Sequence, residues 1–173
     1  MKAHFLKSSL QRLLALLCVA ALGAGAAGAK SSKSAKGLSD LIVSYEIEGA
    51  GTGIQGTYLV QVTIVKEKAT DVEVPLRMAA VHGVLFRGFA GYRQAQKPLA
   101  GSAAAEAEHA DFFSDFFSET GSAVNYASIV SGSTTVTKMS KNYQITATLT
   151  VQKDQLREYL EDAGVLKSLN SIF

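Results

Sequence analysis

Alternating apolar and polar residues mark the clearest strand of the sequence near its C-terminal end. Between Tyr143 and Val151 every second residue is apolar, and the residues between them are glutamine or threonine. A period of two places the apolar set on one face of a sheet and the polar set on the other. The preceding segments VNYASIV (124–130) and TTVTKMS (134–140) have the composition of shorter strands. We therefore predict a three-stranded meander whose last turn contains Lys141–Asn142.

The same alternation predicts a hairpin near the N-terminal end. Alternate positions are apolar from Asp40 to Ile47, and a second alternating run extends from Tyr58 to Ile64. The glycine-rich segment GAGTGIQG (49–56) separates the two runs and predicts the connecting loop. Glycine-rich loops bind phosphate where a helix N-terminus follows. Because a strand follows here, the pattern argues against a nucleotide site.

The segment from Pro75 to Tyr92 changes to the helical period. Proline suits the first turn of a helix, and apolar residues then occupy most sides of the helical wheel, which indicates a largely buried helix. Gly83 and Gly88 weaken a helix unless another element packs closely against them. Their presence predicts tight contact with the sheet.

A second helix is predicted over AAAEAEHADFFSDFFSETG (103–121), and a third over DQLREYLEDAG (154–164), capped by Asp154 and ended by Gly164. In the second helix a spacing of four residues creates two aromatic rows and one acidic row. These rows are Phe112 with Phe116, Phe113 with Phe117, and Asp111 with Asp115 and Glu119. Each buried phenylalanine contributes roughly 1.5–3 kcal/mol. We interpret the aromatic rows as core anchors, with a ligand-binding aromatic box as the alternative.

The order of these elements is β-β-α-α-β-β-β-α. It predicts an α+β fold in which an antiparallel sheet of about five strands carries helices packed on one face.

A leader precedes the predicted domain. Residues 1–29 run from a basic section through an apolar stretch into small residues, which is typical of a secretory signal peptide; a membrane anchor is the alternative, and the short apolar length argues against it. Residues 30–39 are polar and predict a flexible tether, followed by a single domain over residues 40–173. The expected location is the periplasm, with release from the cell as the alternative.

Composition narrows the range of functions. Cys18, the single cysteine, lies inside the leader and is not placed as a lipid-attachment site, so a cleaved chain has no disulfide, thiolate metal site or cysteine nucleophile. The leader holds three of the 17 basic residues and none of the 15 acidic ones, which leaves the rest at a net charge of −1. That balance argues against nucleic acid as a partner. We also expect no transmembrane segment after signal cleavage.

Motifs for metal or hydrolytic chemistry are absent from the sequence. The histidines His82 and His109 form no HExxH pair, and no serine lies in a GxSxG motif. We interpret His82 as a core or interface histidine and His109 as a solvated residue at a helix start. No metal, cofactor or catalytic residue is therefore predicted.

The segment FRGFAGYR contains the predicted binding residues. Aromatic and arginine side chains lie close together there, next to an exposed loop: Phe86, Arg87, Phe89 and Tyr92. The alternative is that the aromatic residues close the core. Threonines of the meander predict a flat polar sheet face, which is either solvated or covered by a partner or a second copy: Thr135, Thr137, Thr146, Thr148 and Thr150.

Several segments carry a resemblance. EIEGAGTGIQGTYLVQV, AAVHGVLFRGF, QKPLAG, ADFFSDFF and KDQLREYLEDAGV together resemble an uncharacterised family of secreted proteins from Bacteroidetes-type bacteria, over residues 44–173. The strand-to-helix junction from Ile145 to Gly164 looks more loosely like small envelope domains of flagellar-assembly and outer-membrane lipoproteins. That second resemblance implies a binding or assembly role.

Two functional hypotheses follow. The first is an exported, non-catalytic binding or assembly module of the cell envelope, whose partner is another envelope protein or a second copy. The second is a small periplasmic hydrolase or ligand carrier with a pocket around His82, Arg87, Tyr92 and His109. An enzyme should gather such groups in one concave pocket, whereas an interaction module should show a flat or apolar exposed patch.

Overall fold

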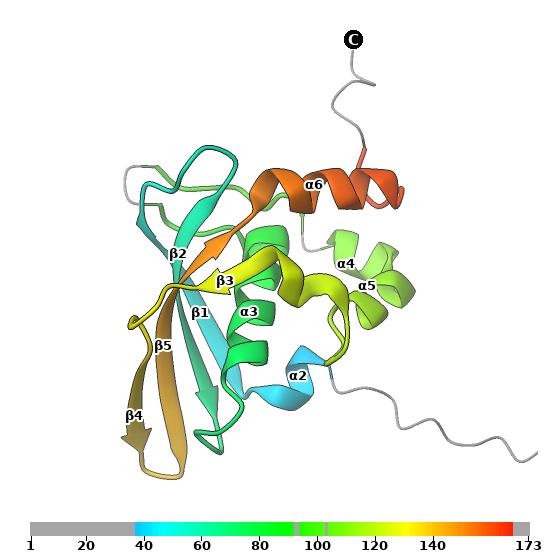
Figure 1. Cartoon of the computed structure of the whole chain (residues 1–173). Coiled ribbons are helices and arrows are strands. Elements are labelled where there is room, and N and C mark those ends of the chain that lie inside the picture. Colours follow the sequence, from blue (N-terminus) through cyan, green and yellow to red (C-terminus); the bar gives the residue numbers. More distant parts are fainter. Residues whose placement is uncertain (1–36, 92–93, 103, 168–173) are drawn as a thin grey trace, which may run out of the picture. The chain divides into compact units, whose positions relative to one another are not determined.

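The computed structural model describes residues 37–91, 94–102 and 104–167. The predicted leader, residues 30–36 of the predicted tether, and Tyr92 lie outside the described residues. Within these ranges the fold is α+β, with an antiparallel sheet of five strands and the helices on one face of it (Figure 1). The predicted fold class is confirmed. No helix in the described ranges is long and apolar enough to cross a bilayer.

Three long strands form the centre of the sheet and two short ones share its far edge. The five strands pair antiparallel with one another, and β1 pairs with β2, which pairs with β5. On its other edge β5 pairs with β3 through residues 149–151 and with β4 through residues 142–146. The strands are β1 (Ser44–Gly51), β2 (Tyr58–Lys66), β3 (Ala127–Ile129), β4 (Thr135–Met139) and β5 (Asn142–Val151).

The register explains the alternation of the sequence. Ile64 pairs with Ile145 and Val62 pairs with Ala147, and all four side chains are buried on the face that meets the helices. On the opposite face Thr63 pairs with Thr146, and their hydroxyl oxygens lie 2.9 Å apart. The helix-facing side chains form the core, whereas the opposite face stays polar.

The first strand begins later than predicted. Alternation predicted a strand from Asp40, but Leu38–Leu41 form a short helix, α2, and β1 starts at Ser44. The carboxylate of Asp40 accepts the backbone N–H of Gly37 at 3.1 Å. This local hydrogen bond satisfies a donor at the helix start and favours the turn over an extended chain.

The predicted meander is wrong at its start, because β3 pairs with β5 beside β4 and not with β4 itself. The first strand is also shorter than predicted. Residues Ser122–Tyr126 form a 3-10 helix, η2, so only Ala127–Ile129 of the predicted strand pair with β5. Tyr126 packs its ring against Tyr159, which draws this segment toward the helices. The last turn contains Ser140 and Lys141, one residue earlier than predicted, because Met139 pairs with Asn142.

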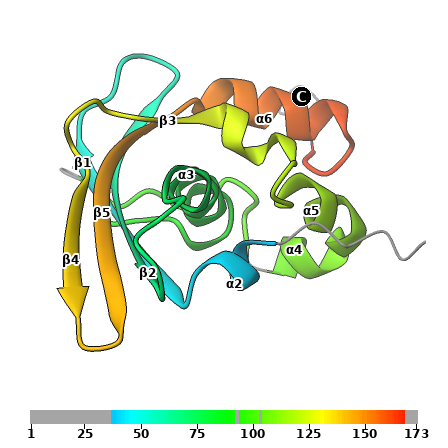
Figure 2. The ribbon, with the colours of Figure 1, turned by 60° about the horizontal axis from the view of Figure 1, so that its bottom comes forward.

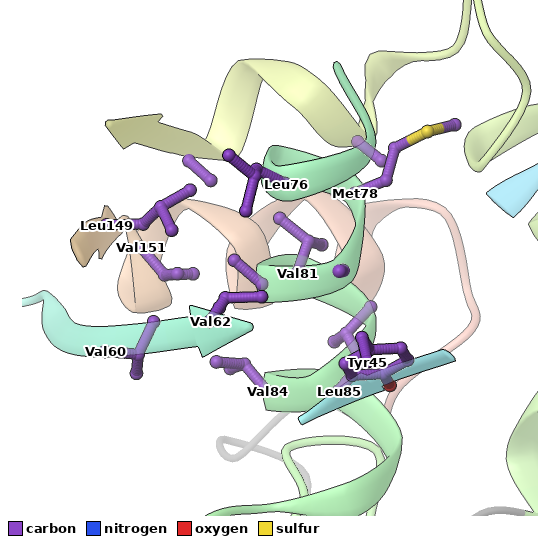
Figure 3. Close-up of a cluster of buried hydrophobic side chains, with 14 of the residues drawn as sticks. Tyr45, Val60, Val62, Leu76, Met78, Val81, Val84, Leu85, Leu149 and Val151 are labelled. Atoms are coloured by element: carbon purple, nitrogen blue, oxygen red, sulfur yellow. The ribbon is translucent and has the colours of Figure 1, made fainter. Parts of the chain in front are cut away.

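Helix α3 (Glu73–His82) covers the centre of the sheet and continues into a π-helix, η1 (Gly83–Arg87). Its side chains Leu76 and Val81 are fully buried, and Figure 3 shows them on the side of the helix that faces Val62. A Cβ atom at Gly83 would lie 2.8 Å from Cδ1 of Ile47 on β1. The predicted contact between this glycine and the sheet is therefore confirmed.

Gly88 serves a different purpose from the predicted one. Its φ of 67° is in the left-handed region that favours glycine, and a Cβ atom there would collide with the backbone of Gln96. This glycine ends η1 and packs against the following loop, not against the sheet.

Replacing Gly83 with alanine is expected to lower the free energy of unfolding by about 1–3 kcal/mol, because the new methyl group overlaps Ile47. Urea denaturation measures the change. The double variant Gly83→Ala with Ile47→Val should recover part of the loss if the overlap is its cause. Equal stability of Gly83→Ala and the parent chain would contradict this packing.

The predicted helix over residues 103–121 divides at His109 into α4 (Ala104–Glu108) and α5 (Ala110–Phe116). His109 has a φ of −120° and a ψ of 39°, which is not helical. The break changes the direction of the chain, so that Glu106 contacts His82 while Phe113 faces Phe86.

The aromatic rows form a second layer on the helices. Phe113, Phe116 and Phe117 are buried, as predicted for core anchors, whereas Phe112 is half-buried. Phe113 contacts Phe86 of η1 edge-on, with ring centroids 4.9 Å apart. Phe116 stacks on Tyr159 of α6 (Lys153–Asp162), with centroids 5.8 Å apart. The rows therefore pack mainly on η1 and α6.

The C-terminal helix differs little from its prediction. It starts at Lys153, one residue before the predicted cap Asp154, and Gln152 occupies the cap position. Gly164 has a φ of 73° and follows the helix end, as predicted. Leu156 and Leu160 are fully buried and fix the helix on the core.

Candidate functional site

An open groove lies where α2, the start of β1, η1 and the α4–α5 pair meet, with a volume of about 880 Å³. Its apolar lining includes Leu38, Ile42, Val43, Phe113 and Phe117, and its polar lining includes Tyr45, His82, Arg87 and Glu106. The groove therefore brings together side chains that are far apart in the sequence.

His82 connects three elements at the floor of this groove. Its Nε2 atom lies 3.0 Å from Oε1 of Glu106 on α4, and its Nδ1 atom lies 2.6 Å from the hydroxyl oxygen of Tyr45 on β1. A carboxylate only accepts hydrogen bonds, so in the neutral imidazole Nε2 donates to Glu106 and Nδ1 accepts from Tyr45. Both ring nitrogens of His82 are thus occupied.

Burial determines the charge state of this cluster. It lowers the pKa of His82 below its ordinary value of 6.5; Glu106 opposes this effect and Arg87 adds to it. Burial also raises the pKa of Tyr45, which Arg87 partly offsets. At neutral pH the imidazole and the phenol are therefore both uncharged, in agreement with the hydrogen bonds.

Arg87 covers Tyr45 from the end of η1. Its guanidinium carbon lies 4.1 Å from the centroid of the Tyr45 ring, and its Nη1 atom donates to the backbone oxygen of Tyr45 at 3.1 Å. A guanidinium over an aromatic face is a favourable cation–π arrangement. The contact ties η1 to β1, while the rest of the arginine remains exposed.

The order tyrosine, histidine, glutamate matches that of a nucleophile, a base and a group that orients the base. The burial and the raised pKa of Tyr45 do not favour catalysis. Tyr45 is only 7% exposed and its pKa is raised, so its oxygen is neither accessible nor readily ionised. We conclude that the cluster holds β1, α3 and α4 together.

The predicted binding residues are separated in the structure. Phe86 is 4% exposed in the aromatic cluster, and Arg87 lines the groove. Phe89 is half-buried against the ring of Tyr58, with centroids 5.2 Å apart, near the hairpin loop. Tyr92 lies outside the described residues. The described members of the predicted site thus belong to three different places.

The residues that line the groove differ from those predicted for a pocket around the two histidines. His82 and Arg87 line the groove, together with Tyr45 and Glu106, which sequence reasoning did not connect to them; His109 is not among the lining residues. Within the described ranges, no three histidine, aspartate or glutamate side chains are placed to hold a metal ion.

A second surface lies at the edge of the sheet. All five residues of β4 are exposed, including Val136 at 49% and Met139 at 48%. Ile145, opposite Val136 on β5, is fully buried. The helix layer thus covers β5 but does not reach β4, which Figure 2 shows at the edge of the sheet, away from α4 and α5. In the described part of the chain β4 pairs with β5 alone, so its other edge is open.

The predicted threonine face adjoins this edge. One row across the sheet contains Thr135, Thr146, Thr63 and Glu46, in that order over β4, β5, β2 and β1. This is the face of the sheet without helices (Figure 1). The predicted threonines therefore do share one polar face.

No family model, no curated protein and no solved structure matches the chain. The groove and the β4 edge are therefore the two surfaces from which a function can be inferred.

Proposed function

We propose that the protein is an exported, non-catalytic binding or assembly module of the cell envelope and that it contacts its partner through the open edge of β4. The observation that carries this proposal is the exposure of Val136 and Met139 on a strand whose outer edge is unpaired within the described residues. Unpaired backbone groups on an edge strand accept a further strand.

The position of the apolar residues on β4 supports a protein partner. Val136 lies on the helix side of the sheet and Met139 on the opposite side, as their partners on β5 require. An added strand would find one exposed apolar side chain on each face. Val130, just after β3, is 39% exposed and extends the apolar surface along the same edge of β5.

Export is the first part of the proposal to test. When the chain is expressed with its leader in a bacterium that carries out secretion, the mature protein is expected in the periplasmic fraction, starting at Lys30. N-terminal sequencing of the purified protein checks this. Recovery of an intact N-terminus from the cytoplasm would contradict export.

The partner surface is tested with variants of the tagged chain in an envelope extract. The double variant Val136→Lys with Met139→Lys is expected to lose captured protein by roughly tenfold or more, because both exposed apolar contacts of the edge are replaced by charges. Quantitative mass spectrometry of the captured proteins measures the loss.

Two control variants separate the edge from other surfaces. Ile54→Lys removes an apolar side chain that is 77% exposed in the hairpin loop, and Ala110→Trp fills the groove without changing the His82 cluster. Both should retain the partner. Loss of capture with Ala110→Trp but not with the edge variant would move the binding site to the groove.

The groove supports a second candidate, a ligand carrier or small hydrolase. Its volume of about 880 Å³ is in the range of small-molecule sites. It also gathers His82 and Arg87 of the second hypothesis with Tyr45 and Glu106, although His109 does not line it. The carrier role agrees better than hydrolysis with a histidine whose two nitrogens are already bonded.

A further inference from the structure

We propose that β4 pairs with β4 of a second copy of this chain, antiparallel, about a two-fold axis that passes beside Thr137. The inference rests on the proposed function, because it names the occupant of the same edge. It joins the two sheets into one continuous sheet, with both helix layers on the same side.

The length of the strand selects the register. Thr137 is the middle residue of β4, so an axis at this position pairs all five residues of Thr135–Met139 with the second copy. Thr137 then faces its own equivalent, Val136 faces Lys138 of the second copy, and Thr135 faces Met139. Any other register leaves part of one strand without a partner strand.

The side chains are compatible with this register. Val136 and Lys138 lie on the helix side of the sheet, since they pair with Ile145 and Tyr143 of β5. In the symmetric dimer each lysine extends its methylene groups over the valine of the other copy and keeps its ammonium group in water. An axis one residue later would place the two lysines directly opposite each other, which is unfavourable.

Nothing in the described helix layer blocks the approach of a second sheet. Val136 is 49% exposed although it is on the helix side, so the space above it is open. Figure 2 shows β4 on the outside of the sheet, with the helices beyond β5. Two copies can therefore meet edge to edge without a change in the packing of either helix layer.

The contact between the two β4 strands is short, so the dimer should be weak. Pairing of two five-residue strands buries less surface than a standard protein interface, so the dimer is expected to be weak and concentration-dependent. A short edge strand with a lysine is also a device by which proteins keep sheet edges unpaired. Lys138 therefore either packs over Val136 of a second copy or keeps the β4 edge unpaired, and the experiment distinguishes between these two roles.

Disulfide trapping tests the axis and the register together. The sequence contains a single cysteine, Cys18, so Cys18→Ser gives a full-length background without thiols. Directly opposite residues of antiparallel strands have Cα atoms about 4.5–5.5 Å apart, which is within the range of a disulfide. In this background Thr137→Cys is expected to form a disulfide-linked dimer with itself under mild oxidation.

Neighbouring positions provide the matched controls. Val136→Cys alone and Lys138→Cys alone should each cross-link slowly, because neither residue faces its own equivalent. An equimolar mixture of these two variants should cross-link faster than either alone, by roughly tenfold or more, because pairing raises the effective concentration of the two thiols. Circular dichroism confirms that each variant is folded, and non-reducing electrophoresis measures the rates.

Equal cross-linking rates at positions 136, 137 and 138, with no gain on mixing, would overturn the proposal. Lys138 would then be a residue that keeps the β4 edge unpaired. The proposed function can be judged separately, because it predicts loss of captured envelope protein with Val136→Lys and Met139→Lys. If no disulfide forms but the lysine double variant still loses captured protein, the second copy is excluded as the occupant. The β4 edge then remains as a site for a different protein. Absence of both effects would reject the β4 edge altogether.

Discussion

Replacing Phe113 with alanine is expected to lower the free energy of unfolding by about 3–5 kcal/mol. The ring is 3% exposed and contacts Phe86 on η1, so its loss leaves a cavity between α5 and η1. Because α4 contains no buried residue, α5 supplies the main apolar attachment of this helix pair. Urea denaturation followed by circular dichroism measures the change.

Ser114 provides the matched control for this prediction. It is the next residue of the same helix and is exposed, so Ser114→Ala should change stability by no more than about 0.5 kcal/mol. If Phe113→Ala costs no more than the control, the aromatic rows do not form part of the core.

Stability is expected to decrease as the pH is lowered below about 6.5 because of His82. Burial lowers the pKa of this histidine in the folded chain, whereas in the unfolded chain it has its ordinary value of 6.5. Between these two values the unfolded chain binds a proton that the folded chain does not bind. As the pH is lowered through this window, the free energy of unfolding therefore decreases, by at most about 1.4 kcal/mol per pH unit.

The variant His82→Gln isolates this effect. Glutamine does not titrate, and its amide retains one donor and one acceptor for Glu106 and Tyr45. The variant is expected to be less stable than the parent chain at pH 7, but its stability should change less between pH 7 and pH 5. The difference between the two pH slopes, from urea denaturation, is the quantity to compare. Parallel slopes would show that His82 keeps its ordinary pKa in the folded chain.

The sequence was most informative where one pattern extends over a whole element. Alternation through β5 predicted which of its faces is buried, because a long central strand is determined by its own periodicity. The pairing of β5 with β4 was predicted as well, whereas its pairing with β2 and β3 was not. The spacing of the phenylalanines likewise predicted which rings would be buried, except for Phe112. Local hydrogen bonding was less visible, so the α2 turn at Asp40 was missed.

The candidate surfaces were harder to predict for a physical reason. The His82 cluster joins Tyr45 and Glu106, which lie 37 and 24 residues from it, and only the break at His109 lets Glu106 face the histidine. The exposure of Val136 depends on where the helix layer ends, which no local pattern encodes. Both features arise from tertiary packing.

Amide hydrogen exchange in the bound state shows directly whether a partner binds at the β4 edge. The measurement compares exchange in residues Thr135–Met139 before and after the chain binds the protein captured from envelope extract, or a second copy at high concentration. We expect exchange in β4 to become slower while exchange in Gly83–Arg87, beside the groove, is unchanged. Slower exchange in Gly83–Arg87 with no change in β4 would contradict binding at the β4 edge and identify the groove as the binding surface.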